Sequence, residues 1–134
     1  MHVSFPSLRD LTPSDRRILA PAFGAAAVAA RRQGKRALDC LYSSLTEALL
    51  GAPYPDAVAL DALADLDDDE VERLIEGLSV QITREAKEGT VSREALFSDL
   101  ALALAAERRR REHVLRRLAA AMDWYDANWP SEQP

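Results

Sequence analysis

The sequence predicts an all-α fold: a small, bundle-like domain of four to six helices with a long C-terminal helix. Alanine and leucine dominate the apolar residues, whereas aromatic residues make up only 6% of the chain and β-branched residues are scarce. Several segments repeat apolar residues at the 3.6-residue period of a helix, and no segment shows strand-like alternation or an internal repeat. A chain of 134 residues is expected to form one domain over 1–134, with short flexible ends at 1–11 and 130–134.

Start and stop signals divide the N-terminal half into helices. Residues 12–15, with the sequence TPSD, predict a threonine N-cap followed by proline at the first helical position. Pro21 is expected to stop or kink this first short helix. An alanine-rich helix should follow over about 22–33, and its small side chains would let another helix pack closely. Gly34 is expected to cap it before a further helix over about 35–50.

The middle of the chain carries two further helix signals. A short helix is expected over 56–63. Asp67 and Glu70 have the spacing of a capping box, and apolar residues follow at helical spacing. This pattern predicts a helix near 68–88 that ends at Gly89.

The last helix is expected over about 93–128, capped by Ser92 and closed by Pro130. Its length of about 50 Å, at 1.5 Å per residue, is large for a compact domain of this size. We therefore expect it to extend beyond the core and to pack on a second copy or another protein. One face of this helix carries the apolar residues Phe97, Leu100, Leu104, Leu115, Leu118, Met122, Tyr125 and Trp129.

Four consecutive arginines, Arg108 to Arg111, interrupt that apolar face. Three interpretations compete. The arginines are solvated and form pairs with glutamates four residues away; or they lie against the acidic segment Asp65 to Glu76 of the same chain or of a symmetry mate; or they bind an anionic partner such as nucleic acid.

The charge distribution does not favour nucleic acid as the main partner. The net charge is −5, and residues 52–90 alone carry three basic and eleven acidic side chains. A general nucleic-acid binder shows a basic excess, and neither a glycine-rich loop nor an aromatic stacking platform accompanies the arginines. Nucleic acid therefore stays an alternative that is possible but not favoured.

Arg108 and His113 are separated by four residues, a spacing that resembles the motif of HEPN-type ribonucleases, which are also small and all-helical. The resemblance implies an arginine that stabilises phosphate and a histidine that moves a proton. On a continuous helix, however, the two residues lie about 140° apart and do not share a face. We assign no catalytic residue and expect that the protein is not an enzyme.

The sequence predicts no metal and no cofactor. Asp65, Asp67, Asp69 and Glu76 match acidic positions of a calcium-binding loop, but Glu70 stands where that loop needs glycine. A helix start rich in carboxylates explains the same residues. A single cysteine, Cys40, excludes an intramolecular disulfide and favours a reducing, cytoplasmic location.

The apolar run 18–30 is too short to span a bilayer and is expected to form a buried helix, so no membrane association is predicted. Together these features predict a non-enzymatic protein–protein interaction module, such as an adaptor, accessory subunit or regulator, which acts through its C-terminal helix on a protein partner or as a homo-oligomer. Tryptophan beside arginine is typical of interaction hot spots. The predicted partner-binding residues are Arg108, Arg109, Arg110, Arg111, Arg116, Arg117, Trp124 and Trp129.

Overall fold

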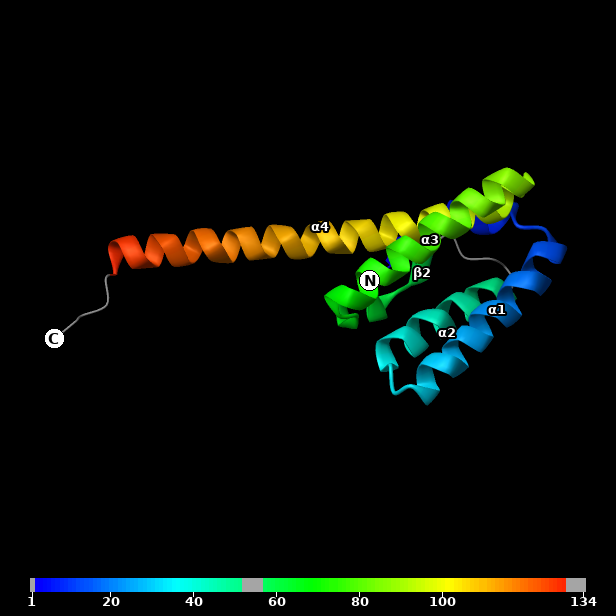
Figure 1. The fold of residues 1–134 in the computed structure, drawn as a ribbon, viewed down its shortest axis with the longest axis horizontal. Helices are drawn as coiled ribbons and strands as arrows, with labels where there is room; N and C mark the ends of the chain where they lie inside the picture. Colours follow the sequence, from blue (N-terminus) through cyan, green and yellow to red (C-terminus); the bar gives the residue numbers. More distant parts are fainter. Residues whose placement is uncertain (1, 52–56, 130–134) are drawn as a thin grey trace.

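A computed structural model describes residues 2–51 and 57–129 and confirms an all-α fold (Figure 1). Four α-helices carry the architecture, and two 3-10 helices and two three-residue strands complete the described part. In chain order the elements are β1 (His2–Ser4), η1 (Pro6–Asp10), α1 (Pro13–Arg32), α2 (Arg36–Leu50), β2 (Ala57–Ala59), η2 (Asp61–Asp65), α3 (Asp68–Glu88) and α4 (Val91–Asn128).

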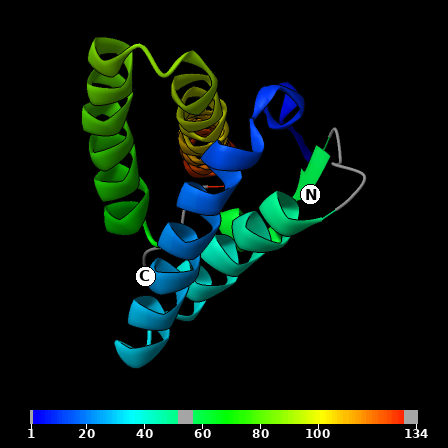
Figure 2. The same ribbon diagram turned by 90° about the vertical axis from the view of Figure 1, so that its right-hand side faces the viewer.

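The helices form two hairpins, α1 with α2 and α3 with α4, which lie side by side in the view of Figure 2. Gly34 and Gly89 stand at the two hairpin turns with φ of 72° and 74°, the left-handed conformation that glycine adopts without a steric penalty. Both glycines therefore end helices as expected. The small buried residues Ala20, Ala27 and Ala30 of α1 allow the close approach that the sequence predicted.

The expectation that one helix stops at Pro21 and another begins at about residue 22 was wrong, because a single helix, α1, runs from Pro13 to Arg32. A proline in a helix interior removes one backbone hydrogen bond and crowds the preceding turn. Pro21 is exposed, whereas Leu19 and Phe23 on either side of it are buried. Packing of both turns against the core holds the helix together across the proline.

The N-terminal segment also differs from the expected flexible end at 1–11. β1 pairs antiparallel with β2, with Val3 opposite Val58, and η1 follows. Phe5, Leu8 and Leu11 recur every three residues, which is the period of a 3-10 helix, and all three are buried. The short helix expected over 56–63 is likewise replaced by β2 and η2. Residues 130–134, including Pro130, lie outside the described part.

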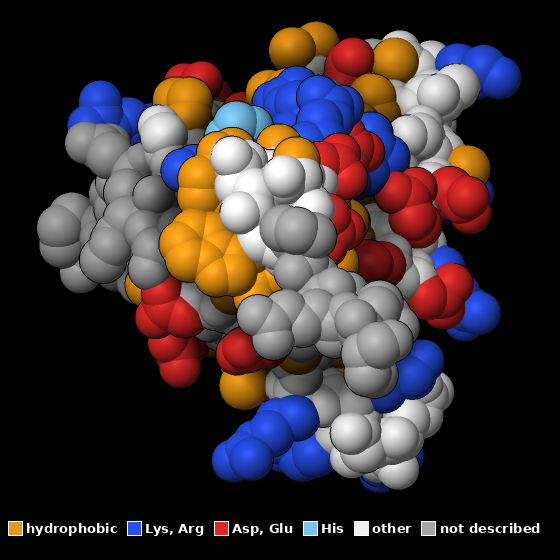
Figure 3. All heavy atoms as spheres, turned by 90° about the vertical axis from the view of Figure 1, so that its left-hand side faces the viewer, with side chains coloured by type: hydrophobic (Ala, Val, Ile, Leu, Met, Phe, Trp, Pro, Cys, Tyr) orange, Lys and Arg blue, Asp and Glu red, His pale blue; other side chains and the backbone are white. Residues whose placement is uncertain are grey.

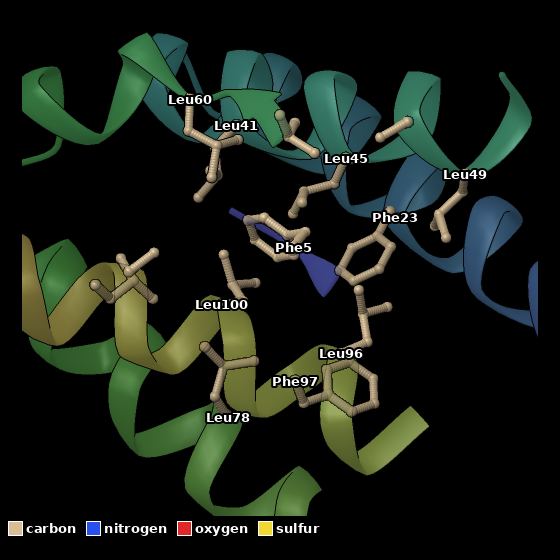
Figure 4. Packing of buried hydrophobic residues seen from close by; sticks show 14 of the residues in the cluster. Phe5, Phe23, Leu41, Leu45, Leu49, Leu60, Leu78, Leu96, Phe97 and Leu100 are labelled. Atoms are coloured by element: carbon tan, nitrogen blue, oxygen red, sulfur yellow. The ribbon is translucent and has the colours of Figure 1, made fainter. Parts of the chain in front are cut away.

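One hydrophobic core joins the two hairpins and the N-terminal segment (Figure 4). Leu41 of α2 and Leu104 of α4 are completely buried in it, as is Phe5. Figure 4 shows Phe5 between the side chains of α2 on one side and those of α4 on the other. The segment before α1 therefore fills the space between the hairpins.

The capping box of α3 is confirmed. The Glu70 backbone N–H donates to the Asp67 carboxylate at 2.7 Å, and the Asp67 N–H donates to Glu70 at 3.0 Å. The start of α4 differs from the prediction: the N-cap is Thr90, not Ser92, and its hydroxyl donates to the backbone carbonyl and carboxylate of Glu85 on α3. A bond across the hairpin turn thus replaces the local cap.

Candidate interaction surface

α4 is a single unbroken helix of 38 residues, about 57 Å long at 1.5 Å per residue. Its inner half, residues 91–111, packs against α3 and the core. Its outer half, taken as residues 112–129 and including the cap residue Trp129, projects from the globule as a rod (Figure 1). Every residue of this outer half is exposed.

Arg111 fixes the point where the rod leaves the globule. Its guanidinium donates to the Leu63 and Leu66 carbonyls at 3.0 and 2.6 Å, near the C-terminal end of η2. It also donates to Asp68 at the start of α3 and to Glu107 one turn back, both at 2.9 Å. A planar guanidinium with five N–H groups suits such a set of acceptors. Arg111 therefore ties three elements together.

The other arginines of the block divide between the inside of the chain and solvent. Arg108 pairs with Glu72 of α3 at 3.1 Å, and Arg110 pairs with Glu107 at 2.7 Å. Arg109 is exposed. For Arg108 and Arg111, the structure therefore supports pairing with the acidic segment 65–76 of the same chain.

Glu107 lies beneath these arginines and is 3% exposed. Hydrogen bonds from Arg110, partly opposed by burial and supported by Arg111, lower the pKa of the Glu107 carboxyl below its ordinary value. Partial burial and the contact with Glu107 also change the pKa of Arg111. Partial burial disfavours its charge, but the hydrogen bonds that Arg111 donates to Glu107 and Asp68 outweigh that cost and raise the pKa of Arg111. This buried carboxylate is therefore ionised and doubly paired.

A stripe of large apolar side chains runs along the outer half of α4. Its members share spacings of three and four residues, so they lie on one face of the helix, and each is between 55% and 65% exposed. The stripe consists of Leu115, Leu118, Met122, Tyr125 and Trp129. Figure 3, which faces the projecting end of the molecule, shows hydrophobic side chains beside a group of Lys and Arg side chains.

Aromatic side chains gather at the far end of this stripe. Tyr125 and Trp129 stack with ring centroids 6.4 Å apart, and Trp124 lies 6.4 Å from Trp129. Trp124 is 59% exposed. The N-terminal segment packs between the hairpins and leaves this tryptophan exposed. The two predicted tryptophans thus form one exposed aromatic cluster.

A shallow hollow of about 210 Å³ lies at the base of the rod. It is bounded by Val71 and Glu72 of α3 and by Arg108, Arg111 and Leu115 of α4. The first stripe residue, Leu115, stands at the edge of this hollow, so the stripe begins where α3 begins.

The predicted binding residues therefore do not form one cluster. Arg108, Arg110 and Arg111 belong to the base of the rod, whereas Trp124 and Trp129 lie about 20 and 27 Å beyond Arg111, at 1.5 Å per residue. Arg116 lies between them and makes only a loose 4.0 Å pair with Glu112. The list of predicted partner-binding residues omitted Leu115, Leu118, Met122 and Tyr125. Their spacing had already placed them on one apolar face of the helix, and the list could have included them on that ground.

The ribonuclease-like pair of Arg108 and His113 and the calcium-binding loop that the sequence raised do not form in the described part of the chain. Arg108 is paired with Glu72, while His113 is exposed further along the same helix. Asp67 caps α3, and the following residues are helical, so no calcium-binding loop forms there. Within residues 2–51 and 57–129, no group of three His, Cys, Asp or Glu side chains could hold a metal ion. Cys40 is an exposed free thiol.

Comparison with protein-family models, with curated proteins and with solved structures finds no match to this chain. In the described part of the chain, no helix combines the length and the apolar character that crossing a lipid bilayer requires.

Proposed function

We propose that the protein is a non-enzymatic protein–protein interaction module, an adaptor, accessory subunit or regulator that binds through the outer half of α4. The observation that carries the proposal is the exposed stripe from Leu115 to Trp129, which continues the buried face of the same helix. Monomeric proteins rarely expose such contiguous apolar surface unless it binds something. A helix laid against an apolar helix face is a common mode of protein recognition.

The arginines support a protein partner better than a nucleic acid. Binding to phosphates requires cations that are free to replace counterions. Arg108, Arg110 and Arg111 instead pair with carboxylates of their own chain. We infer that the arginine block orients the rod. The exposed Arg116 and Arg117 lie on the side of the rod that faces away from the apolar stripe, at 100° per residue, and keep that side polar.

The proposal is tested by affinity capture with the full chain as bait. The stripe variant carries Leu118→Glu and Met122→Glu, which places two charges on the apolar face. A matched control carries Leu50→Glu and Val80→Glu, two equally drastic changes at apolar residues exposed on α2 and α3. We expect proteins that bind the wild-type bait, including further copies of the chain, to be lost with the stripe variant and retained with the control.

The interaction is then reconstituted with the purified partner and measured by titration calorimetry. If the stripe variant and the wild type bind the same proteins equally well, the outer half of α4 is not the binding surface. Nucleic-acid binding is checked separately by a mobility shift at low salt. A salt-dependent shift that is lost on changing Arg109, Arg116 and Arg117 to glutamate would favour the nucleic-acid alternative instead.

A further inference from the structure

We propose that the occupant of the apolar stripe is a second copy of this chain, whose α4 lies antiparallel to the first. The inference rests on the proposed function and specifies its partner. It assigns the outer half of α4 to a two-stranded coiled coil with a two-fold axis near residue 120. Four observations support it: the heptad spacing, the position of α3, the distribution of charge along the outer half of α4, and the area that the pairing would bury.

The seam of α4 follows a heptad pattern without interruption. Its positions alternate in steps of four and three, which is the spacing of helices that wind around each other. In order they are Phe97, Ala101, Leu104, Arg108, Arg111, Leu115, Leu118, Met122, Tyr125 and Trp129. On the inner half, other elements of the same chain cover this seam: Arg108 and Arg111 pair with α3, and Leu104 is buried in the core. The outer half continues the same seam without a second helix.

The position of α3 selects the antiparallel direction. α3 runs antiparallel to α4, and its first residue, Asp68, pairs with Arg111. In a parallel dimer the helix of the second copy would continue past Arg111 into the space that α3 occupies. In an antiparallel dimer it runs in the same direction as α3 and ends at Asn128, close to the start of α3. The second copy thus covers the part of the seam that α3 leaves uncovered.

In antiparallel coiled coils the first position of the heptad on one helix lies opposite the fourth position on the other, which allows registers that differ by seven residues. The register with its axis near residue 120 pairs the whole outer half and stops at Arg111, where α3 begins to cover the seam. Leu118 lies opposite Met122 of the second copy, and Leu115 lies opposite Tyr125 of the second copy. Trp129 of the second copy reaches the hollow beside Arg111. A tryptophan ring against a guanidinium gains cation–π attraction there.

The distribution of charge along the outer half of α4 favours the same direction. Arg116 and Arg117 lie toward the base of the rod, whereas Asp123 and Asp126 lie toward its tip. In the antiparallel register, Arg116 of each copy lies at the height of these two aspartates of the other. In a parallel pair, each charged residue would instead lie level with the same residue of the other copy. Like charges at the same height of such an interface oppose association. Ala119 and Ala121 flank the axis and let the two helices approach closely.

The buried area is sufficient for a stable dimer. The five stripe side chains of each copy are each more than half exposed, and they include Tyr125 and Trp129. With the flanking residues, pairing would cover roughly 600 Å² on each copy, or about 1,200 Å² in total, which lies within the range of specific interfaces.

The oligomeric state of the full chain is measured by light scattering coupled to size exclusion and by sedimentation equilibrium. We expect a dimer with twice the 14.8 kDa mass of one chain. Leu118→Glu with Met122→Glu should raise the dissociation constant at least about a hundredfold, because four seam side chains of the dimer are lost. The control variant with Leu50→Glu and Val80→Glu should remain dimeric. Circular dichroism checks that both variants stay helical.

The direction of pairing is tested by disulfide cross-linking in a Cys40→Ser background, which removes the exposed native thiol. Ala121 and Asn128 occupy equivalent positions of successive heptads. In a parallel dimer, cysteines at these two positions would cross-link equally. In the antiparallel register, Ala121→Cys lies next to its counterpart, whereas Asn128→Cys is separated from its counterpart by roughly 24 Å along the axis. We expect Ala121→Cys to cross-link and Asn128→Cys to remain monomeric on denaturing gels.

The possible outcomes separate this inference from the proposed function. Equal cross-linking at both positions overturns the antiparallel arrangement. A wild-type chain that stays monomeric up to about 100 μM overturns the homodimer, since specific dimers form well below that concentration. If the monomer still captures another protein and the stripe variant does not, the proposed function stands and only its partner changes. If neither a dimer nor a stripe-dependent partner is found, both proposals fail.

Discussion

The two halves of α4 carry the same sequence pattern in opposite surroundings. Leu96, Phe97, Leu100 and Leu104 of the inner half are between 0% and 7% exposed, because α3 and the rest of the core cover them. The apolar residues of the outer half continue the same seam and are more than half exposed. Hydrophobic periodicity thus identifies an apolar face, but it does not show whether another element of the same chain covers that face.

The boundary between the halves is made by charges. Arg111 reaches back to the end of η2 and to the start of α3, and it also pairs with the buried Glu107. These contacts satisfy polar groups at the edge of the core and place a cationic turn directly before the first exposed stripe residue. The buried part of α4 therefore ends at the arginine block, whereas the helix itself continues to Asn128.

The largest expected effect tests the difference in burial directly. Leu104→Ala should lower the free energy of unfolding by about 2–5 kcal/mol, because Leu104 is fully buried and its removal leaves a cavity. Leu118→Ala makes the same chemical change in the outer half. It should alter the unfolding of the monomer by less than about 0.5 kcal/mol, because the Leu118 side chain is 55% exposed and its removal leaves no cavity in the core.

Urea denaturation of both variants gives the two values, measured at protein concentrations low enough to keep the chain monomeric. The Glu-substituted stripe variant provides the monomeric background if the wild type dimerises. A loss of more than about 1 kcal/mol for Leu118→Ala in that background would show that the outer half packs on its own globule.

The boundary itself is tested by comparing two arginines. Arg111→Ala leaves Glu107 and two backbone carbonyls with fewer partners at a buried edge, and we expect a loss of about 2–4 kcal/mol in unfolding free energy. Arg116→Ala removes a side chain that is 80% exposed and makes only a 4.0 Å pair, so its effect should stay within about 0.5 kcal/mol.

Arg111→Lys refines this test. It keeps the charge but cannot reach the same acceptors with one ammonium group, so its unfolding free energy should lie between those of the wild type and Arg111→Ala. If Arg111→Lys matches the wild type, charge alone holds the base of the rod, and the hydrogen bonds to the carbonyls contribute nothing measurable.

Much of the fold follows from local sequence signals. Gly34, Gly89 and the pair Asp67 and Glu70 set helix ends through backbone conformation and capping, which depend on few neighbours. α3 has the predicted bounds for the same reason. Pro21 misled because its effect depends on tertiary packing: the helix on both sides of it is held by buried residues, which the local sequence does not reveal.

The role of the N-terminal segment and the contacts of the arginine block were harder to predict, because both depend on residues far apart in the sequence. The N-terminal segment contains too few residues at any one period to indicate that Phe5, Leu8 and Leu11 fill the core. Similarly, pairing of Arg111 with η2 and α3 joins residues more than forty positions apart. The sequence could limit the arginine block to three interpretations, but choosing among them required the position of α3.

The smallest expected effect concerns the protonation of Glu107. Hydrogen bonds from Arg110, against the opposing effect of burial and together with Arg111, lower the pKa of this carboxyl in the folded state. A lowered folded pKa means that the ion pairs add stability above the pKa of the unfolded chain, about 4.3 for a glutamate. That stability is lost as the pH falls below this value towards the folded pKa. Glu107→Gln should therefore destabilise the protein at pH 7 and make less difference near pH 3, as measured by thermal unfolding of both proteins. Arg116→Ala in the outer half should show no such convergence. A Glu107→Gln effect that is the same at both pH values would mean that the side chain acts through packing and not through its charge.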